Sequence, residues 1–275
     1  MTIHPIQIFL GLLVAAVITV LAYRFQLLTR SGALAAFGLG TVVFGLGGLR
    51  WAIVLMIFFL TSSGLSRLLR KKKEATEDKY SKGSTRDAWQ VLANGGLAGF
   101  FVILHYFLPQ SPLTWIGFCA AFSAANADTW ATELGSLSRI PPQMITTLKK
   151  VEAGTSGAVS WLGMAAAILG ALVVALTGTL FDPYAAVQPA HLALTVITIG
   201  GIAGSLMDSW LGATLQAIYY CPQCKKETEK NPQHWCGTDT ELIRGKTWMN
   251  NDVVNAVCTG SGAATALLII LVTGI

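Results

Sequence analysis

The ten residues 126–135, NADTWATELG, end a segment that is apolar from about Leu113, yet they contain two carboxylates, an amide and two hydroxyl groups. An ionisable residue at the centre of a membrane-spanning helix costs roughly 2.5 to 3.5 kcal/mol, and such residues usually face a cavity or a partner. Residues 205–216, SLMDSWLGATLQ, repeat the pattern, with Asp208, a hydroxyl residue and Trp210 at the foot of a second apolar run. The two stretches predict a weak internal repeat of two parallel helices around one site.

The composition of the whole chain indicates a polytopic membrane protein. Of its 275 residues 53% are hydrophobic and only 12% are charged, and the mean hydropathy is +0.58, which is too apolar for an ordinary soluble domain. A helix needs about 20 residues to cross a hydrocarbon core about 30 Å thick. We therefore expect an all-α transmembrane helical bundle, a single domain over residues 1–275, with about eight spans. The windows are roughly 6–23, 31–48, 51–68, 88–108, 113–135, 157–179, 190–217 and 252–274.

The basic residues predict the orientation of these spans. With the amino terminus outside, the cytoplasmic segments and the adjoining helix ends hold 18 of the 19 Lys and Arg, and Arg50 is the exception. This bias follows the positive-inside rule and sets the orientation. We expect an integral, multi-pass protein of a plasma or thylakoid-type membrane, with its site facing the cytoplasm. The pI near 9.0 then reflects orientation and anionic lipid headgroups, and nucleic acid is excluded as a partner. The cytoplasmic segments are residues 24–30, a basic linker at 69–87, a loop at 136–156 and a Cys/His loop at 218–251.

Polar residues at the cytoplasmic ends of five spans predict one shared site. The fourth, sixth and eighth spans begin with polar stretches, and the fifth and seventh spans end with them. In the fifth span Asn126 and Glu133 lie on one helix face and Asp128 on another, so both faces must be buried unless the helix is broken. The alternative is that these groups only cap helices and hydrogen-bond between spans. The predicted site contains Asp87, Asp128, Glu133, Asp208 and Asp252. It is lined by residues that we expect to bind substrate: Asn94, Asn126, Ser209, Gln216 and Asn255.

The types of these side chains favour magnesium and phosphate chemistry. Carboxylate and amide oxygens with few available His residues suit Mg²⁺ bridging phosphates better than zinc hydrolysis. The turn Gly154-Thr155-Ser156-Gly157 precedes the sixth span and is either an anion site at a helix amino terminus or an ordinary helix cap. The sequence contains no convincing Walker A motif and no GxSxG. Phosphate oxygens are expected to contact Lys149, Lys150, Thr155, Ser156 and Arg244, with Lys246 also at the rim.

The Cys/His loop contains a second group of candidate ligands. Cys221 and Cys224 form a CxxC motif, and His234 and Cys236 follow as HxC. These four residues are the right number and type for a structural tetrahedral zinc. Because the loop is predicted to be cytoplasmic, a disulfide is disfavoured. Free reduced thiols and a redox pair remain alternatives.

Five sequence blocks resemble one family of integral membrane proteins. The strings QVLANGG, NADTWATELG, GTSGAVSWLG, GSLMDSWLGATLQ and RGKTWMNNDVVN, in this order from Gln90 to Asn255, are similar to the signature blocks of the family that contains transmembrane protein 19 and the plant and cyanobacterial phytyl-phosphate kinases. The resemblance implies transfer of a phosphoryl group from a nucleoside triphosphate, CTP or ATP, to an isoprenoid monophosphate. The product would be the prenyl diphosphate used in tocopherol and quinone pathways.

For such a kinase we expect the carboxylates to be catalytic and to hold Mg²⁺. Asp128, Asp208 and Asp252 are the expected ligands, Glu133 a ligand or its neighbour, and Asn126 and Asn255 the groups that orient them. The expected partners are an isoprenoid phosphate lipid, a nucleoside triphosphate and membrane lipids. The alternative function is a secondary transporter or flippase for a phosphorylated lipid or small anion, because transporters also build sites from paired polar helix breaks.

Overall fold

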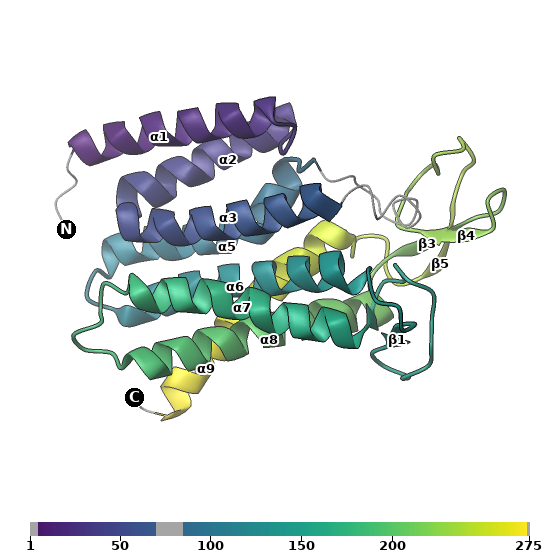
Figure 1. Ribbon diagram of the computed structural model, residues 1–275. Coiled ribbons are helices and arrows are strands. Elements are labelled where there is room, and N and C mark those ends of the chain that lie inside the picture. Colours follow the sequence, from purple (N-terminus) through teal and green to yellow (C-terminus); the bar gives the residue numbers. More distant parts are fainter. Residues whose placement is uncertain (1–4, 70–84, 274–275) are drawn as a thin grey trace.

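The computed structural model describes residues 5–69 and 85–273 and shows a bundle of long helices (Figure 1). The described helices match the eight predicted windows, and the all-α class is confirmed. The first residue of α1 and the last residue of α9 lie at the same end of the bundle (Figure 1), as an even number of spans requires. The helices are α1 (Pro5–Arg24), α2 (Arg30–Val42) continued by the π-helical turn η1 (Val43–Gly47), α3 (Leu49–Leu69), α5 (Ala88–Phe107), α6 (Pro112–Gly135), α7 (Trp161–Leu180), α8 (Ala190–Thr214) and α9 (Asn251–Thr273).

Two small antiparallel sheets project from one end of the bundle (Figure 1). They form within and beside the two loops predicted at 136–156 and 218–251, and most of the linker predicted at 69–87 lies outside the described residues. The first sheet pairs β1 (Gln143–Met144) with β2 (Ala158–Val159). The second has the order β4-β3-β5, with β3 (Ile218–Cys221), β4 (Lys226–Thr228) and β5 (Glu241–Arg244). Only two to four residues in each strand are paired, so these sheets need support from other contacts.

Helix α6 is the central helix of the bundle. It packs against α3, α5, α7, α8 and α9, and its residues from Thr114 to Ala127 are all buried. By length and composition seven of the described helices could cross a membrane, counting α2 with η1, and α6 is not one of them. Because protein surrounds α6, it needs no apolar surface toward lipid. The helix is also continuous to Gly135, so it is not broken at its polar stretch. Within that stretch Asn126 is buried, and Asp128 and Glu133 are half-buried beside a cavity.

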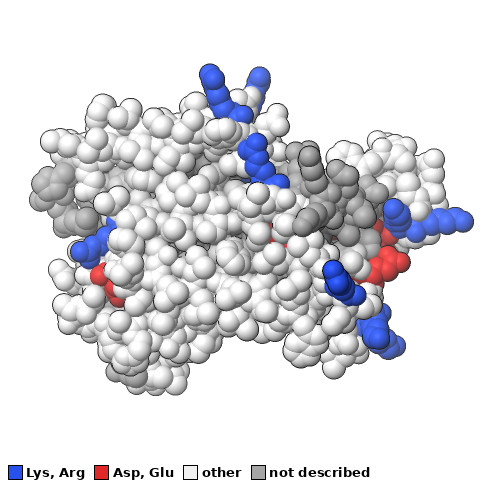
Figure 2. All heavy atoms as spheres, viewed as in Figure 1, with Lys and Arg blue, Asp and Glu red and all other residues white. Residues whose placement is uncertain are grey.

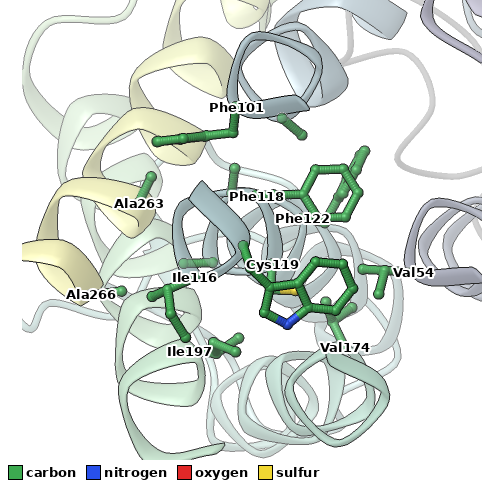
Figure 3. Close-up of a cluster of buried hydrophobic side chains, with 14 of the residues drawn as sticks. Val54, Phe101, Ile116, Phe118, Cys119, Phe122, Val174, Ile197, Ala263 and Ala266 are labelled. Atoms are coloured by element: carbon green, nitrogen blue, oxygen red, sulfur yellow. The ribbon is translucent and has the colours of Figure 1, made fainter. Parts of the chain in front are cut away.

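An aromatic core fixes the half of α6 that lies away from the polar stretch (Figure 3). Trp115, Phe118 and Phe122 of α6 are fully buried, and Phe122 stacks on Phe58 of α3 with ring centroids 4.9 Å apart. The buried indole N–H of Trp115 donates a hydrogen bond to the carbonyl oxygen of Gly178 at 3.0 Å. Large aromatic surfaces dominate the energy of such a core, so this end of the bundle is packed and apolar.

Small residues bring the backbones of α6 and α8 together just before the two carboxylates. A Cβ atom built on Gly201 would lie 2.1 Å from Ser123 Oγ, and one on Gly204 would lie 2.5 Å from Ala124 Cβ. Such close approach is the usual role of Gly and Ala between membrane helices. The two helices run in the same direction (Figure 1), and Asp128 and Asp208 each follow their contact residue by one turn. The repeat predicted from the sequence therefore places both carboxylates at the same level.

The outer surface of the bundle is apolar between its charged ends. Figure 2 shows a wide area without Lys, Arg, Asp or Glu across the helices, and most of the visible Lys and Arg lie in the half of the molecule toward the strands. Large side chains such as Phe9, Leu34 and Val272 are exposed on this surface, as lipid-facing residues are. Which side of the membrane the strands face stays a prediction.

Candidate functional site

A cavity of about 300 Å³ lies at the end of the bundle that carries the strands. It is bordered by the last turns of α3, α6 and α8, the first turns of α5 and α9, and the segment before α7. The predicted convergence of polar helix ends therefore occurs. The predicted residues that line the cavity are Asn94, Asp128, Glu133, Thr155, Ser156, Asp208, Ser209, Gln216 and Asn255.

Three carboxylates from α6 and α8 form the inner wall of this cavity. Asp128 and Asp208 lie close enough for their charges to interact, and Asp208 also interacts with Glu229. The buried Oδ2 atom of Asp208 has no hydrogen-bond partner among the described residues. One turn beyond Asp128, Glu133 accepts a hydrogen bond from the Ser66 hydroxyl at 2.8 Å. Because like charges disfavour each other's ionised form, a bound cation would stabilise the ionised Asp128 and Asp208 pair.

The Gly154–Gly157 turn also lines this cavity. Gly157 has φ +85°, and a Cβ atom there would lie 2.2 Å from the backbone nitrogen of Ala213. Glycine is therefore required for the turn to rest on the last turn of α8. Helix α7 begins only at Trp161, and the Ser160 hydroxyl accepts a hydrogen bond from Gly163 N at 3.1 Å as its amino-terminal cap.

The sixth span was predicted to begin at roughly residue 157, and α7 begins four residues later because the chain first pairs as β2. The capping interpretation of Thr155 and Ser156 is wrong, because Ser160 caps the helix. Both hydroxyl residues line the cavity instead.

Glu229 forms the outer wall of the cavity and was not predicted. It follows β4, and its Oε1 atom accepts hydrogen bonds from the Ser156 hydroxyl at 2.9 Å and from Gln216 Nε2 at 2.8 Å. Gln216 is buried, with 3% of its surface exposed. These contacts join the loop after α8 to the turn before α7. A single acidic residue in a polar loop has no periodic pattern, so the sequence carried no signal for it.

Arg86 is the second residue that was missed, because the sequence assigned it to the basic linker. Its backbone is held by Thr29 N–H donating to Arg86 O at 3.0 Å and Arg86 N–H donating to Leu27 O at 3.0 Å. The guanidinium lies 5.6 Å from the centre of the Phe58 ring. Burial lowers the pKa of Arg86 to about 10, and the charge of Glu133 opposes that shift. Arg86 therefore keeps its charge at neutral pH.

A narrow apolar groove meets the polar cavity at Arg86. The groove has a volume of about 70 Å³ and lies between α1, α2, α3 and α5. Its walls include Ala36, Leu39, Phe58 and Val91. Three residues line both the groove and the cavity: Arg86, Gln90 and Asn94. The apolar groove and the carboxylate-lined cavity thus share a wall formed by these three residues.

Two of the predicted substrate-binding residues are used as structural links. Asn126 is fully buried, and its amide donates to Gly170 O at 2.9 Å and accepts from the Thr61 hydroxyl at 3.0 Å. Arg244 donates to the backbone oxygens of Ser156 at 3.3 Å and Gly212 at 3.2 Å. Neither side chain lines the cavity. Asn126 thereby links α6 to α3 and α7, and Arg244 links β5 to the Gly154–Gly157 turn and to α8.

Other predicted residues lie outside the cavity wall. Asp87 accepts a hydrogen bond from Gln90 N at 2.9 Å and caps α5. Lys149 and Lys150 are exposed in the loop after β1, and Lys246 is exposed too. Asp252 lies in the first turn of α9, where the neighbouring Asn251 and Asn255 face the cavity and Asp252 does not.

The four Cys/His residues gather in the projecting sheet. One potential ligand atom from each of Cys221, Cys224, His234 and Cys236 lies within 4.8 Å of all the others. Cys119 and Cys258 are buried within spans, as expected for packing residues.

The fold and the cavity define a multi-pass membrane protein with a hydrophilic site at one end of its bundle. The chain belongs to the family described as integral membrane protein DUF92, whose family model matches residues 13–263. The family membership predicted from the five sequence blocks is thereby confirmed.

Curated relatives cover most of the chain. Protein PGR of Arabidopsis thaliana is 31% identical over 270 residues, which are 91% of this chain and 92% of that protein. An uncharacterized membrane protein of Methanocaldococcus jannaschii is 33% identical over 211 residues, 77% of this chain and 84% of that one. Protein VTE6, chloroplastic, of Arabidopsis thaliana is 26% identical over 245 residues, 88% of this chain and 65% of that protein. No solved structure matches the chain.

Proposed function

We propose that the protein is an isoprenoid monophosphate kinase. It transfers a phosphoryl group from a nucleoside triphosphate, CTP or ATP, to phytyl phosphate or another prenyl monophosphate, and forms the prenyl diphosphate at the cytoplasmic membrane face. The observation that carries this proposal is the contact between the carboxylate-lined cavity and the apolar groove at Arg86, Gln90 and Asn94. An amphiphile with an anionic head is the ligand that fits both volumes.

The acceptor lipid would lie across Arg86. Its prenyl chain occupies the groove between α1, α2, α3 and α5, and its phosphate meets the guanidinium at the groove's polar end. Arginine suits this position because its planar donors match phosphate oxygens and its charge persists when it is partly buried. The charge of Glu133 and the ring of Phe58 both interact with the guanidinium.

The nucleotide phosphates would occupy the wider cavity, which opens toward the aqueous end. There Thr155 and Ser156 of the Gly154–Gly157 turn line the same cavity as Asp128 and Asp208. A glycine-rich turn lets a phosphate approach the backbone closely.

The carboxylates fit the magnesium ion that such a reaction needs. The donor set consists of hard oxygens, and the buried Oδ2 of Asp208 has no hydrogen-bond partner in the described part of the chain. Asp128 and Asp208 would hold the ion, and we leave Asp252 out because it does not line the cavity. When bound, Mg²⁺ neutralises the charge that develops on the transferred phosphoryl group.

The protein's own residues then have to position two phosphates and exclude water. An oxygen of the acceptor phosphate forms a bond to the γ-phosphorus, and the bond from that phosphorus to the β–γ bridging oxygen breaks. The nucleoside diphosphate leaves with the electron pair. Because the acceptor is already anionic, no general base is needed, and positioning together with charge neutralisation supplies the rate.

The resemblance of the sequence blocks supports the same reaction class. The five sequence blocks resemble those of phytyl-phosphate kinases, and the similarity to Protein VTE6 extends over 88% of the chain. The transporter alternative needs a polar route to the far side of the membrane. In the described residues the far half of α6 is instead packed with Trp115, Ile116 and Phe118, each 0% exposed.

Thermal stabilisation of the purified protein in detergent tests the proposal. A ligand that binds the folded state raises the melting temperature. We expect stabilisation by Mg-CTP or Mg-ATP and, separately, by a prenyl monophosphate, with the nucleotide effect abolished by a chelator. Stabilisation by the lipid phosphate alone, together with flux of that lipid phosphate in vesicles, would favour the transporter and contradict the kinase.

A further inference from the structure

The cysteine and histidine side chains of the projecting sheet have the dimensions of a metal site. The Sγ atoms of Cys221 and Cys236 are 3.5 Å apart, and His234 Nδ1 lies 3.4 Å from Cys236 Sγ. Two thiolates bound to a tetrahedral zinc at about 2.3 Å would be roughly 3.8 Å apart. The arrangement therefore needs little movement to hold one ion.

The local backbone also has the form that a metal-binding CxxC turn needs. Cys221 ends β3 and is fully buried, and the N–H of Cys224 donates to Cys221 Sγ at 3.4 Å. Lys225 has φ +53°, and its N–H donates to Cys221 O at 2.8 Å, which closes the turn. An N–H directed at sulfur stabilises a thiolate, the form that binds metal. His234 comes from a separate loop and is also buried, with 6% of its surface exposed.

The sheet lacks an apolar core large enough to explain its order. Strands β3, β4 and β5 have three or four residues each. Ile218 and Tyr219 of β3 are buried, but Leu242 and Ile243 of β5 and Trp235 in the loop before it are exposed. Small domains of this kind usually need a disulfide or a metal. All five cysteines of the chain are free thiols.

We propose that Cys221, Cys224, His234 and Cys236 bind one structural Zn²⁺, and that this zinc-bound sheet holds Glu229 in the wall of the cavity. Glu229 lies between the two ligand pairs in the sequence, directly after β4. Strand β4 pairs with β3 through Tyr219 and Thr228, so fixing the two ligand pairs fixes the strand end that presents Glu229. The carboxylate then binds Ser156 and Gln216, which joins the sheet to the Gly154–Gly157 turn.

The metal is structural because all four tetrahedral positions are filled by protein ligands. Its effect on the cavity is indirect, and Glu229 is a positioning residue for the turn. Any effect of zinc on phosphoryl transfer rests on the proposed function, whereas the metal site and its hold on Glu229 do not.

Metal analysis of the full-length protein, purified in detergent without added chelator, tests the site. We expect about one zinc per chain in the wild type and in Cys258→Ala, a control thiol buried in α9, and near zero in Cys224→Ser. If Cys224→Ser does not fold, wild-type protein produced with cobalt should show the intense visible bands of a tetrahedral cobalt–thiolate centre. A wild type without metal, whether its thiols are free or joined in a disulfide, would overturn the proposal.

Hydrogen exchange tests the link to the cavity without any assay of transfer. Removing zinc with a chelator should increase exchange in residues 154–157 and 226–229 and leave the buried turns of α6 unchanged. Glu229→Gln should retain zinc and increase exchange at 154–157 alone. Unchanged exchange at 154–157 after zinc loss would overturn the positioning role. Because neither readout depends on turnover, a failure here is distinguishable from a failure of the kinase proposal.

Discussion

Replacing Arg86 with Gln tests the contact between the apolar groove and the polar cavity. The guanidinium is charged at neutral pH, since its pKa is lowered only to about 10, and it is partly buried at the edge of both volumes. A hydrogen bond to a charged group contributes about 1.5 to 3 kcal/mol. Losing one such contact to the acceptor phosphate lowers kcat/KM by about 10- to 150-fold.

The loss should fall on the lipid substrate more than on the nucleotide. Arg86 is shared with the groove, so we expect a rise in KM for the prenyl phosphate and a smaller change in KM for the nucleotide. Arg86→Lys retains the charge without the planar pair of donors, and we expect a loss of about tenfold.

Initial rates over a range of prenyl phosphate concentrations, in mixed detergent micelles, measure this effect. Arg139→Gln is the matched control, because Arg139 is exposed at the same end of the bundle and does not line the cavity. If Arg86→Gln, folded and with the melting temperature of the wild type, matched this control in kcat/KM, the assignment of the acceptor phosphate to Arg86 would be refuted.

Three further substitutions test other parts of the account. Asp208→Asn should reduce the rate of magnesium-dependent transfer by about 100-fold or more, because it removes about 3 kcal/mol of charge stabilisation. A metal titration should show that the variant needs a higher magnesium concentration. Ala36→Phe should narrow the groove and raise KM for a long prenyl phosphate by about tenfold while sparing a five-carbon one, as kinetics with both would show. Asn126→Ala removes the hydrogen bonds that Asn126 forms with Gly170 O and the Thr61 hydroxyl. It should lower the free energy of unfolding by about 1 to 2 kcal/mol, measured by thermal unfolding, and leave kcat nearly unchanged.

The bundle and the inner wall of the site could be predicted because both follow from the physics of the bilayer. Apolar length determined the helices, and the cost of burying charge identified Asp128 and Asp208 as residues that need a protein environment. The similarity of their surroundings predicted that they lie on parallel helices. Helix α6 is less apolar than a lipid-exposed span. This composition fits its position, because a helix enclosed by five others can contain small and polar residues.

The outer wall could not be predicted, since it depends on how short loops fold back on the helix ends. Glu229 reaches the cavity only because β4 pairs with β3, and Arg86 does so because residues 27–29 hold its backbone. Asn126 and Arg244 were predicted to bind substrate, but both form hydrogen bonds to neighbouring elements of the protein instead. The sequence pattern shows which residues cannot face lipid. It does not show which of these residues form hydrogen bonds within the protein and which contact the cavity.

Transfer of labelled phosphate is the most direct test of the central claim that this cavity phosphorylates a lipid phosphate. Purified protein is incubated with γ-labelled CTP or ATP, magnesium and a panel of prenyl monophosphates, with Asp208→Asn in parallel. We expect label in a prenyl diphosphate with at least one donor, and we expect this label to be lost without magnesium and strongly reduced in Asp208→Asn. Absence of product with every donor and acceptor, from protein that is folded and stabilised by its ligands, would contradict it.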